Sequence, residues 1–390
     1  MAAAPSATTA PAKPGAGAPT SGGAENPQPG SQSVVPFLRG SGKGKYKFYS
    51  RSGLTLTSAA QDLGPIDVKA YDYMRAILVT VTSTANGGAT GTAQADAPFN
   101  FFTNVAVKQP NGQTMYQVSS GIHSAYIQKY GYYRAFSDPR QDPNFAVTGS
   151  SATFAFRIPF ELDLRDALGA LPNKDAAAPF SLELTANTLT NVYGSGQGTS
   201  PTFTVEAWLE AYDQPPTSLD GKPVQTTPPN MNTLQRWTEQ NITMSTGQFD
   251  ARVRKLGNYI RELIHVMKNS SNVRIVTNGW ADPLQIVLDE DVKDNISQAD
   301  FTRRIWEVWG YGQIAPGSTA TVSLDVAGGQ DTGVWPIQYF HDTRDEVENA
   351  NLYLPTIESE DYLLRGSYGS AVAKLVMLVC EVLPQGDIFG

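Results

Sequence analysis

Histidine often supplies metal ligands and general bases, and this sequence contains three: His123, His265 and His341. A catalytic zinc or iron centre gathers two or three histidines and a carboxylate around one point. These three are spread over both halves of the chain and form no His-x-His pair. No Gly-x-Ser-x-Gly motif and no Cys–His pairing indicates a nucleophile. We therefore expect a protein that is not an enzyme, with no catalytic residue, no metal and no cofactor, and structural roles for His123 and His265.

Four acidic residues, Asp289, Glu290, Asp291 and Asp294, are close enough in sequence for a weak calcium site. They lack the Asp-x-Asp-x-Asp-Gly loop that places calcium ligands, so we interpret them as a solvated turn. The single cysteine, Cys380, lies in an apolar run and is expected to be a small buried hydrophobic side chain. A single cysteine also excludes a disulfide within the chain.

Basic and aromatic side chains alternate in the stretch Gly40–Arg51, GSGKGKYKFYSR. In an extended segment one face would carry Lys43, Lys45 and Lys47, and the other face the aromatic side chains. The Gly-Lys pairs are not a phosphate loop, because the glycine spacing is absent and no Ser or Thr follows the lysine. The run is therefore either a solvated charged segment or a contact for lipid headgroups or a nucleic acid backbone.

Charge is distributed unevenly along the chain. Residues 1–51 contain six basic residues and one acidic residue, and six minus one gives +5. The whole chain is −8, which leaves −13 for residues 52–390. Residues 1–33 are almost entirely Ala, Pro, Gly, Ser and Thr, and cannot bury enough apolar surface to fold alone. We predict a flexible to extended, basic N-terminal arm over residues 1–51, and its charge indicates an anionic partner.

Two similar halves must position these residues, and a proline-rich stretch separates them. The stretch Asp213–Asn232 contains five prolines, which exclude a helix or a central strand. Each half opens on a β-rich segment, at Tyr73 and at Tyr259, and closes on an apolar run before a proline. A chain of 390 residues also exceeds what one hydrophobic core usually supports. We predict a first domain over 52–212, a connector over 213–248 and a second domain over 249–390.

Each half combines strands with one inserted helix. Hydrophobic alternation and turn residues predict about eight strands per half, with the clearest hairpin around Pro110-Asn111-Gly112. Helical spacing is found at Ser119–Phe136, with Ser120 as N-cap, and at Ser297–Gly312, where Ser297 begins a capping-box-like turn. The predicted fold class is therefore all-β, with two tandem eight-stranded jelly rolls. If the halves are duplicates, Arg75 aligns with Arg261 and the two helices align.

Several segments carry a resemblance to a known family: YDYMRAILVTVTSTANG, APFNFFTNVAVKQPNGQ and the Ser-Gly-x-His start of SSGIHSAYIQK in the first half. ATFAFRIPFELDLRDALGALPN and, in the second half, NISQADFTRRIWEVW continue the pattern. Their order is similar to that of the double-jelly-roll major capsid proteins of tailless, membrane-containing double-stranded DNA phages, the tectiviruses. The resemblance covers about residues 65–385 and departs at the N-terminus, where the family often has a helical, Gln-rich arm.

The resemblance implies a function, an oligomer and a location. The chain would be a major capsid protein, a homotrimer whose neighbouring trimers tile an icosahedral virion shell over an internal lipid membrane and a double-stranded DNA genome. Penton and minor capsid or membrane proteins would be further partners, without sequence-specific nucleic acid binding. The arm residues Lys43, Lys45, Lys47 and Arg51 would face the particle interior and contact anionic lipid. Without a signal peptide or an apolar membrane span, assembly is expected in the host cytoplasm.

Two other protein classes have features to weigh against this interpretation. Tandem jelly rolls also form bicupin metalloenzymes, but these need clustered histidines in each barrel, which this sequence lacks. The alternative from another class is a trimeric β-sandwich spike that binds a receptor or a carbohydrate. Its stacking platforms would be four tryptophans: Trp280, Trp306, Trp309 and Trp335. Such spikes seldom carry a basic, flexible arm, and this favours the capsid interpretation.

Overall fold

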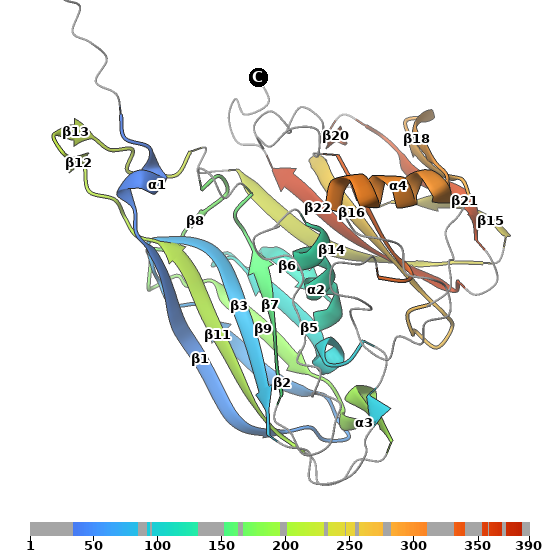
Figure 1. The fold of residues 1–390 in the computed structure, drawn as a ribbon, viewed down its shortest axis with the longest axis horizontal. Coiled ribbons are helices and arrows are strands. Elements are labelled where there is room, and N and C mark those ends of the chain that lie inside the picture. Colours follow the sequence, from blue (N-terminus) through green and yellow to red (C-terminus); the bar gives the residue numbers. More distant parts are fainter. Residues whose placement is uncertain are drawn as a thin grey trace, which may run out of the picture.

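The computed structural model describes residues 34–84, 92–93, 96–131, 152–162, 167–195, 201–229, 233–245, 247–253, 257–275, 282–309, 331–339, 353–357, 359–368 and 372–383. Two β-domains, here called roll 1 and roll 2, lie side by side (Figure 1). Roll 1 is formed by the chain before the proline-rich stretch and roll 2 by the chain after it. Four main strands form each of the two sheets of a roll.

Roll 1 has the strand order of a jelly roll. One sheet runs β1-β11-β3-β7 and the other β2-β9-β5-β6, all with antiparallel neighbours. The strands are β1 Lys43–Thr55, β2 Gln61–Asp67, β3 Tyr73–Ser83, β5 Phe102–Lys108, β6 Thr114–Val118, β7 Ala152–Pro159, β9 Ser181–Ala186 and β11 Thr202–Tyr212.

Roll 2 repeats this order strand for strand. Its sheets run β14-β22-β16-β19 and β15-β21-β17-β18. The strands are β14 Leu234–Thr243, β15 Gly247–Arg252, β16 Tyr259–Lys268, β17 Leu284–Leu288, β18 Asp291–Ile296, β19 Val334–Gln338, β21 Tyr362–Tyr368 and β22 Lys374–Leu383. The predicted fold class, two tandem eight-stranded jelly rolls, is therefore confirmed, and so is the prediction that both halves share one strand order.

A shared irregularity fixes the alignment of the two rolls. Arg75 and Arg261 each occupy the third position of the third strand of their roll. Each lies in a β-bulge, because the pairing with the neighbouring strand skips that residue on both occasions. The prediction that Arg75 aligns with Arg261 is thus met at the level of strand register.

Short elements complete the described chain. The proline-rich stretch forms a small hairpin, and Val35, just before the first helix, pairs with Val224 beside it. The short elements are α1 Phe37–Gly40, β4 Thr92–Ala93, η1 Phe99–Phe101, β8 Leu171–Pro172, α3 Leu189–Val192, β10 Tyr193–Ser195, β12 Ser218–Leu219, β13 Lys222–Pro223 and β20 Leu354–Pro355.

One helix is inserted between the fifth and sixth main strands of each roll: α2, Gly121–Tyr130, between β6 and β7, and α4, Gln298–Trp309, between β18 and β19. At the start of α4 the backbone N–H of Asp300 donates to Ser297 Oγ at 3.1 Å, which confirms the predicted cap. Ser120 occupies the N-cap of α2 without a side-chain cap hydrogen bond. The predicted extension of α2 to residue 136 lies outside the described residues.

The burial of each strand explains its sequence pattern. β3 and β11 alternate between buried apolar and partly exposed side chains, because only one face of their sheet meets the core of roll 1. By contrast, β16 and β22 are buried over nearly their whole length. β22 is correspondingly almost continuously apolar, whereas β16 also buries Arg261, Glu262 and His265. Their sheet has the roll 2 core on one face and helix α2 with roll 1 on the other, so the hydrophobic cluster is continuous across both rolls.

Two predicted boundaries differ from the structure. The arm was expected to extend to Arg51, but Lys43–Thr55 is strand β1 and pairs along its length with β11. The connector was expected to reach residue 248, but β14 already begins at Leu234. Both segments are strands with one face toward solvent. The polar or charged residues on that face made the sequence resemble an arm or a connector rather than a strand. Residues 1–33, the predicted flexible part of the arm, lie outside the described residues.

Candidate functional site: a buried junction and two exposed faces

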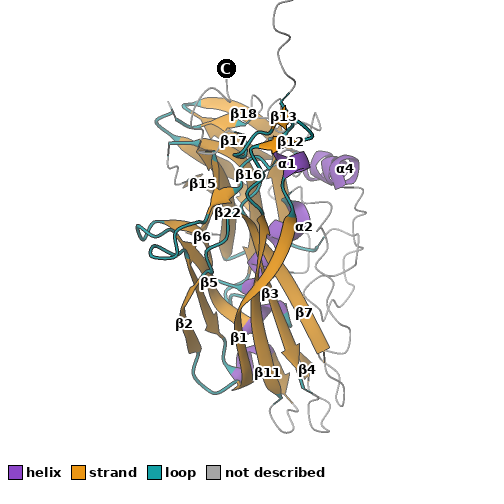
Figure 2. Cartoon of the chain, turned by 90° about the vertical axis from the view of Figure 1, so that its left-hand side faces the viewer, coloured by secondary structure: helices purple, strands orange, loops and turns teal. Residues whose placement is uncertain are grey.

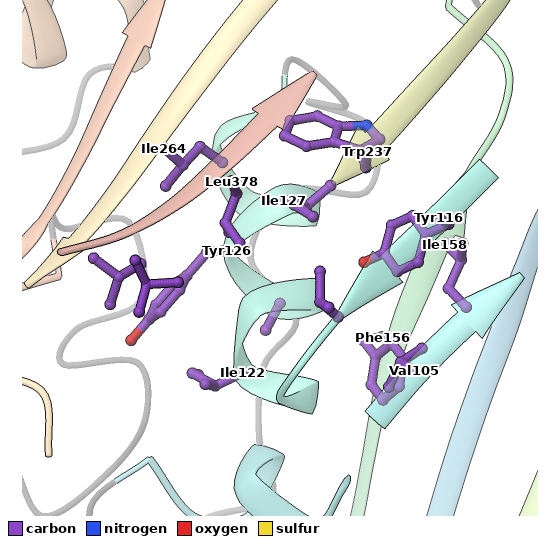
Figure 3. Close-up of a cluster of buried hydrophobic side chains, with 14 of the residues drawn as sticks. Val105, Tyr116, Ile122, Tyr126, Ile127, Phe156, Ile158, Trp237, Ile264 and Leu378 are labelled. Atoms are coloured by element: carbon purple, nitrogen blue, oxygen red, sulfur yellow. The ribbon is translucent and has the colours of Figure 1, made fainter. Parts of the chain in front are cut away.

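Helix α2 lies between the two rolls, and all ten of its residues are buried. On one side it packs against its own roll, where Tyr116 donates to Ser124 Oγ at 2.8 Å. On the other side Tyr126 and Ile127 approach Ile264 and other apolar residues of roll 2 (Figure 3). A helix buried all round needs apolar or hydrogen-bonded residues on every face, so α2 has no polar stripe. Helix α2 therefore joins the rolls together with the parallel pairing of β6 and β14, where Tyr116 lies opposite Trp237 and the sheets of the two rolls become continuous.

The start of α2 is held by a glutamate from roll 2. Glu239 on β14 accepts hydrogen bonds from the Ser119 backbone N–H at 2.7 Å, from Ser119 Oγ at 2.5 Å and from His123 Nδ1 at 2.8 Å. Burial alone would raise the pKa of the Glu239 carboxyl, but His123 and the Ser119 donors hold that pKa well below its usual range. Burial lowers the pKa of His123. We call this group the Glu239 clasp.

The end of α2 is held by a second buried network. Tyr130 donates to Asp331 Oδ2 at 2.7 Å and accepts from the Asp331 backbone N–H at 2.9 Å. Lys129 forms a fully buried ion pair with the same carboxylate at 2.8 Å. Trp309 and Gln338, both from roll 2, donate to the Tyr130 carbonyl oxygen at 3.2 and 2.8 Å. Both ends of α2 are therefore fixed to roll 2 by hydrogen bonds, which makes the chain a rigid two-roll block.

Other polar contacts strengthen the same junction. Arg274 of roll 2 pairs with Asp96 of roll 1 at 3.0 Å and also donates to the Thr332 carbonyl oxygen. Gln235 donates to the Glu161 carbonyl oxygen of roll 1 at 3.0 Å. Because these groups are buried and paired across the junction, separating the rolls would leave charges and donors unsatisfied.

The basic residues predicted from the sequence lie along one strand. Lys43, Lys45 and Lys47 share the exposed face of β1, with their ammonium groups 5.6, 5.1 and 5.4 Å from the ring centres of Tyr212 or Trp208 on β11. Lys47 also pairs with Glu206 at 3.1 Å. These cation–π contacts hold the lysine chains flat on the sheet.

The same sheet face continues over the next strands. Leu78 on β3 and Trp208 on β11 are both half-buried neighbours in register. Arg157 on β7 reaches across to Glu210 with two hydrogen bonds of 2.9 and 2.7 Å. We define the basic face as Lys45, Lys47, Leu78 and Trp208.

Helix α4 presents the second exposed face. Its buried side packs on roll 2 through Phe301, which meets Trp335 edge-on with ring centres 5.1 Å apart. Its outer side carries Asp300, Arg303, Trp306 and Glu307, and Trp306 is 64% exposed. The helix stands at the margin of the molecule (Figure 2).

The remaining candidate residues have structural surroundings. His265 points into the core of roll 2, where burial lowers its pKa to about 3, and Cys380 is buried as predicted. In the acidic cluster, Asp294 holds Arg304 with bonds of 2.8 and 3.2 Å, while Asp289 and Glu290 form the turn between β17 and β18. Within the described ranges no group of three or more His, Cys, Asp or Glu could hold a metal ion. His341 and Trp280 lie outside the described residues.

Of the spike's proposed stacking platforms, two have packing roles. Trp335 is buried against Phe301, and Trp309 packs edge-on against Tyr130 with ring centres 5.7 Å apart. Only Trp306 is exposed among the three tryptophans that the structure describes at these positions. None of the helices in the described part of the chain is long and apolar enough to span a membrane.

Comparison with solved structures identifies the fold. The chain superposes on the MCP of STIV, Sulfolobus Turreted Icosahedral Virus, with a TM-score of 0.59 and 13% identity, covering 88% of this chain and 97% of that one. The PBCV-1 virus capsid matches with a TM-score of 0.56 and 12% identity, over 88% of this chain and 93% of that chain. The major capsid protein of bacteriophage PM2 gives 0.51 and 9% identity, over 88% and 99%.

Sequence-level comparisons add nothing to this, because no family model and no curated protein matches the chain. The shared feature is the fold: the two rolls and their order along the chain reproduce the double jelly roll of major capsid proteins. The superpositions cover nearly all of each neighbour, so the likeness extends to both rolls and their relative placement.

Proposed function

We propose that this chain is a major capsid protein, the building block of an icosahedral virion shell. The observation that carries the proposal is the pair of like-ordered rolls locked by α2, superposed over nearly the full length of capsid proteins. A shell subunit must hold its shape under load from all sides. The buried polar networks at both ends of α2 meet that need, because neither roll can rotate without breaking them.

The proposed assembly is a homotrimer, with trimers tiling a shell around an internal membrane and a double-stranded DNA genome. Three chains of two similar rolls present six similar units around one axis, a shape that packs with its neighbours. Penton and minor capsid or membrane proteins would fill the remaining positions, and the finished particle would assemble in the host cytoplasm. No specific observation favours the carbohydrate-binding spike, since two of its expected platforms are occupied by packing.

Light scattering of the purified chain tests the oligomer directly. The proposal expects a mass near three times 42.0 kDa that does not change on dilution. Negative-stain images of the same sample should show trimers or shells. A monomer at every concentration, with no assembly on concentrating, would contradict the proposed function.

Membrane contact requires a refinement of the sequence-based hypothesis. An extended strand rises about 3.3 Å per residue, so Lys43 and Arg51 are separated by roughly 26 Å along β1. If the strands stand normal to the shell, the four basic residues cannot all meet one flat membrane. We therefore propose that lipid contact belongs to Lys43 and the chain before it, including the exposed Arg39 of α1.

Vesicle co-sedimentation distinguishes these positions. Each basic residue near an anionic surface contributes about 1 kcal/mol, so Arg39→Gln with Lys43→Gln should weaken binding roughly thirtyfold. The matched control compares the single variants Lys43→Gln and Arg51→Gln, which remove the same charge at exposed positions roughly 26 Å apart along β1 and outside the basic face. Lys43→Gln should weaken binding about fivefold, and Arg51→Gln should bind as the unmodified chain does. Equal losses for these two variants would refute the assignment.

A further inference from the structure

The two inserted helices occupy equivalent places in the two rolls. Both α2 and α4 lie between the fifth and sixth main strands of their roll, and each begins after a serine at its N-cap, Ser120 and Ser297. The two helices can therefore be aligned from these serines, and the two rolls from their bulged arginines, Arg75 and Arg261. With these two alignments, each residue in the contact between α2 and roll 2 can be matched to a residue of α4 or of roll 1.

The helix alignment matches contact positions with exposed positions. Counting from the N-cap serine, the α2 residues that contact roll 2 fall at positions 3, 6, 7, 9 and 10: His123, Tyr126, Ile127, Lys129 and Tyr130. At four of these positions α4 has the outer residues Asp300, Arg303, Trp306 and Glu307, and at position 7 it has Arg304, which pairs with Asp294 of its own roll. Their side chains are 47, 64 and 53% exposed for Asp300, Arg303 and Glu307, and Trp306 is 64% exposed. The side of α4 that is open in the single chain is thus the side that α2 buries.

The sheet alignment identifies the surface of roll 1 that corresponds to the α2-binding surface of roll 2. We call this surface of each roll its receptor face. In roll 2 the side chains that receive α2 include Trp237, Glu239, Ile264 and Leu378 (Figure 3). Counting from the bulged arginines and following the printed strand pairings, the equivalent residues of roll 1 are the four of the basic face: Lys45, Lys47, Leu78 and Trp208. The place that α2 covers in roll 2 is therefore open in roll 1.

We infer that helix α4 of one copy docks on the basic face of roll 1 of a second copy, as α2 docks on roll 2 within the chain. The charges agree with this. Position 3 and its receptor are His123 and Glu239 inside the chain, and Asp300 and Lys47 between chains, so the acidic and basic partners have exchanged sides. By the same alignment Arg303, the counterpart of Tyr126, lies over the half-buried Leu78 and Trp208, where its guanidinium can stack on the indole ring. Trp306 and Glu307, the counterparts of Lys129 and Tyr130, face the β7 side of the sheet, because Gln338, which donates to Tyr130, has Pro159 as its counterpart.

The donor and receptor surfaces lie on different rolls, so the contact is head to tail rather than self-complementary. Successive copies would continue the alternation of roll 1 and roll 2, and the proposed homotrimer requires this head-to-tail contact to close into a ring after three copies. The inference deepens the proposed function, since it rests on the homotrimer and names the surfaces that hold it together.

Engineered cysteines test the contact. The only native cysteine, Cys380, is buried, so a chain carrying Asp300→Cys and Lys47→Cys has two new accessible thiols. Oxidation should convert it into covalent dimers and trimers on a non-reducing gel. The matched control replaces Asp300→Cys by Val292→Cys, which is 50% exposed on neighbouring β18 and outside the docking side, and should remain monomeric on the gel.

Charge reversal gives a second readout. Lys47→Asp should raise the dissociation constant of the trimer at least tenfold, and adding Asp300→Lys should restore most of the loss. Circular dichroism of each variant checks that the rolls are folded, which is expected because both side chains are exposed.

The outcomes separate the two proposals. If the unmodified chain is a trimer but the cysteine pair does not cross-link and Lys47→Asp leaves the trimer intact, the docking surface is wrong while the capsid function stands. If the unmodified chain is a monomer at all concentrations, the proposed function itself fails. Cross-linking with loss and rescue on charge reversal establishes the contact.

Discussion

Replacing Glu239 by Ala should destabilise the chain by about 3 kcal/mol, the lower end of what breaking a buried pair costs. The Glu239 side chain is only 6% exposed and accepts three hydrogen bonds across the junction. Ser119 is itself exposed, so water can replace the lost acceptor for its two donors. His123 is fully buried, and its Nδ1–H would lose its partner, which alone costs about 1–3 kcal/mol.

Urea unfolding at pH 7.5 and fixed protein concentration measures this loss, because any oligomer makes stability depend on concentration. The matched control is Asp250→Ala, which removes an ion pair of 3.1 Å whose partners are about half exposed and should cost less than about 1 kcal/mol. In a double-mutant cycle, Glu239→Ala and His123→Ala should couple by more than about 1 kcal/mol. Equal, small losses for Glu239→Ala and Asp250→Ala would refute the idea that the clasp holds the rolls together.

Three further perturbations have defined outcomes. Because burial lowers the pKa of His265 to about 3, stability should fall by about 1.4 kcal/mol per unit as pH drops from about 6.5, the unfolded value, towards 3, and His265→Leu should reduce that slope in urea titrations. Gly333→Ala, at φ +70° with a carbonyl oxygen 2.4 Å from the added Cβ, should lower the melting temperature far more than Gly112→Ala, where φ is +83° but space is open. Tyr130→Phe should cost about 1–3 kcal/mol in urea unfolding by removing the hydroxyl bonded to Asp331.

Features with a local cause could be predicted from the sequence. The hairpin at Gly112 requires a positive φ that glycine adopts without cost, and the structure has φ +83° there. The cap of α4 needs only Ser297 and the next three residues. The apolar run of β22 reflects burial on both faces of its sheet, which favours a continuous hydrophobic pattern.

Features that depend on distant partners could not be predicted in the same way. The sequence pattern places Glu239 in the connector, because its strand is polar on one side and its partners Ser119 and His123 lie over one hundred residues earlier. The alternation of Trp237 and Glu239 with partly exposed neighbours was the signal available, and it is weak without the other roll. The lysines of β1 show the period of a strand, yet their charge alone suggested an arm.

The comparison between the two rolls gives a physical reason for that charge. The receptor face of roll 2 is covered as the chain folds, so it can be apolar, and Trp237, Ile264 and Leu378 are buried there. The equivalent face of roll 1 stays in water until a second copy arrives. A large apolar patch in that position would make the free chain aggregate. Lysines over Trp208 keep the face soluble while leaving an aromatic surface beneath them, and they attract the carboxylates of α4. The receptor face of roll 2 is thus hydrophobic, because α2 covers it as the chain folds. The equivalent face of roll 1 is charged, because we infer that α4 covers it only when copies of the chain assemble.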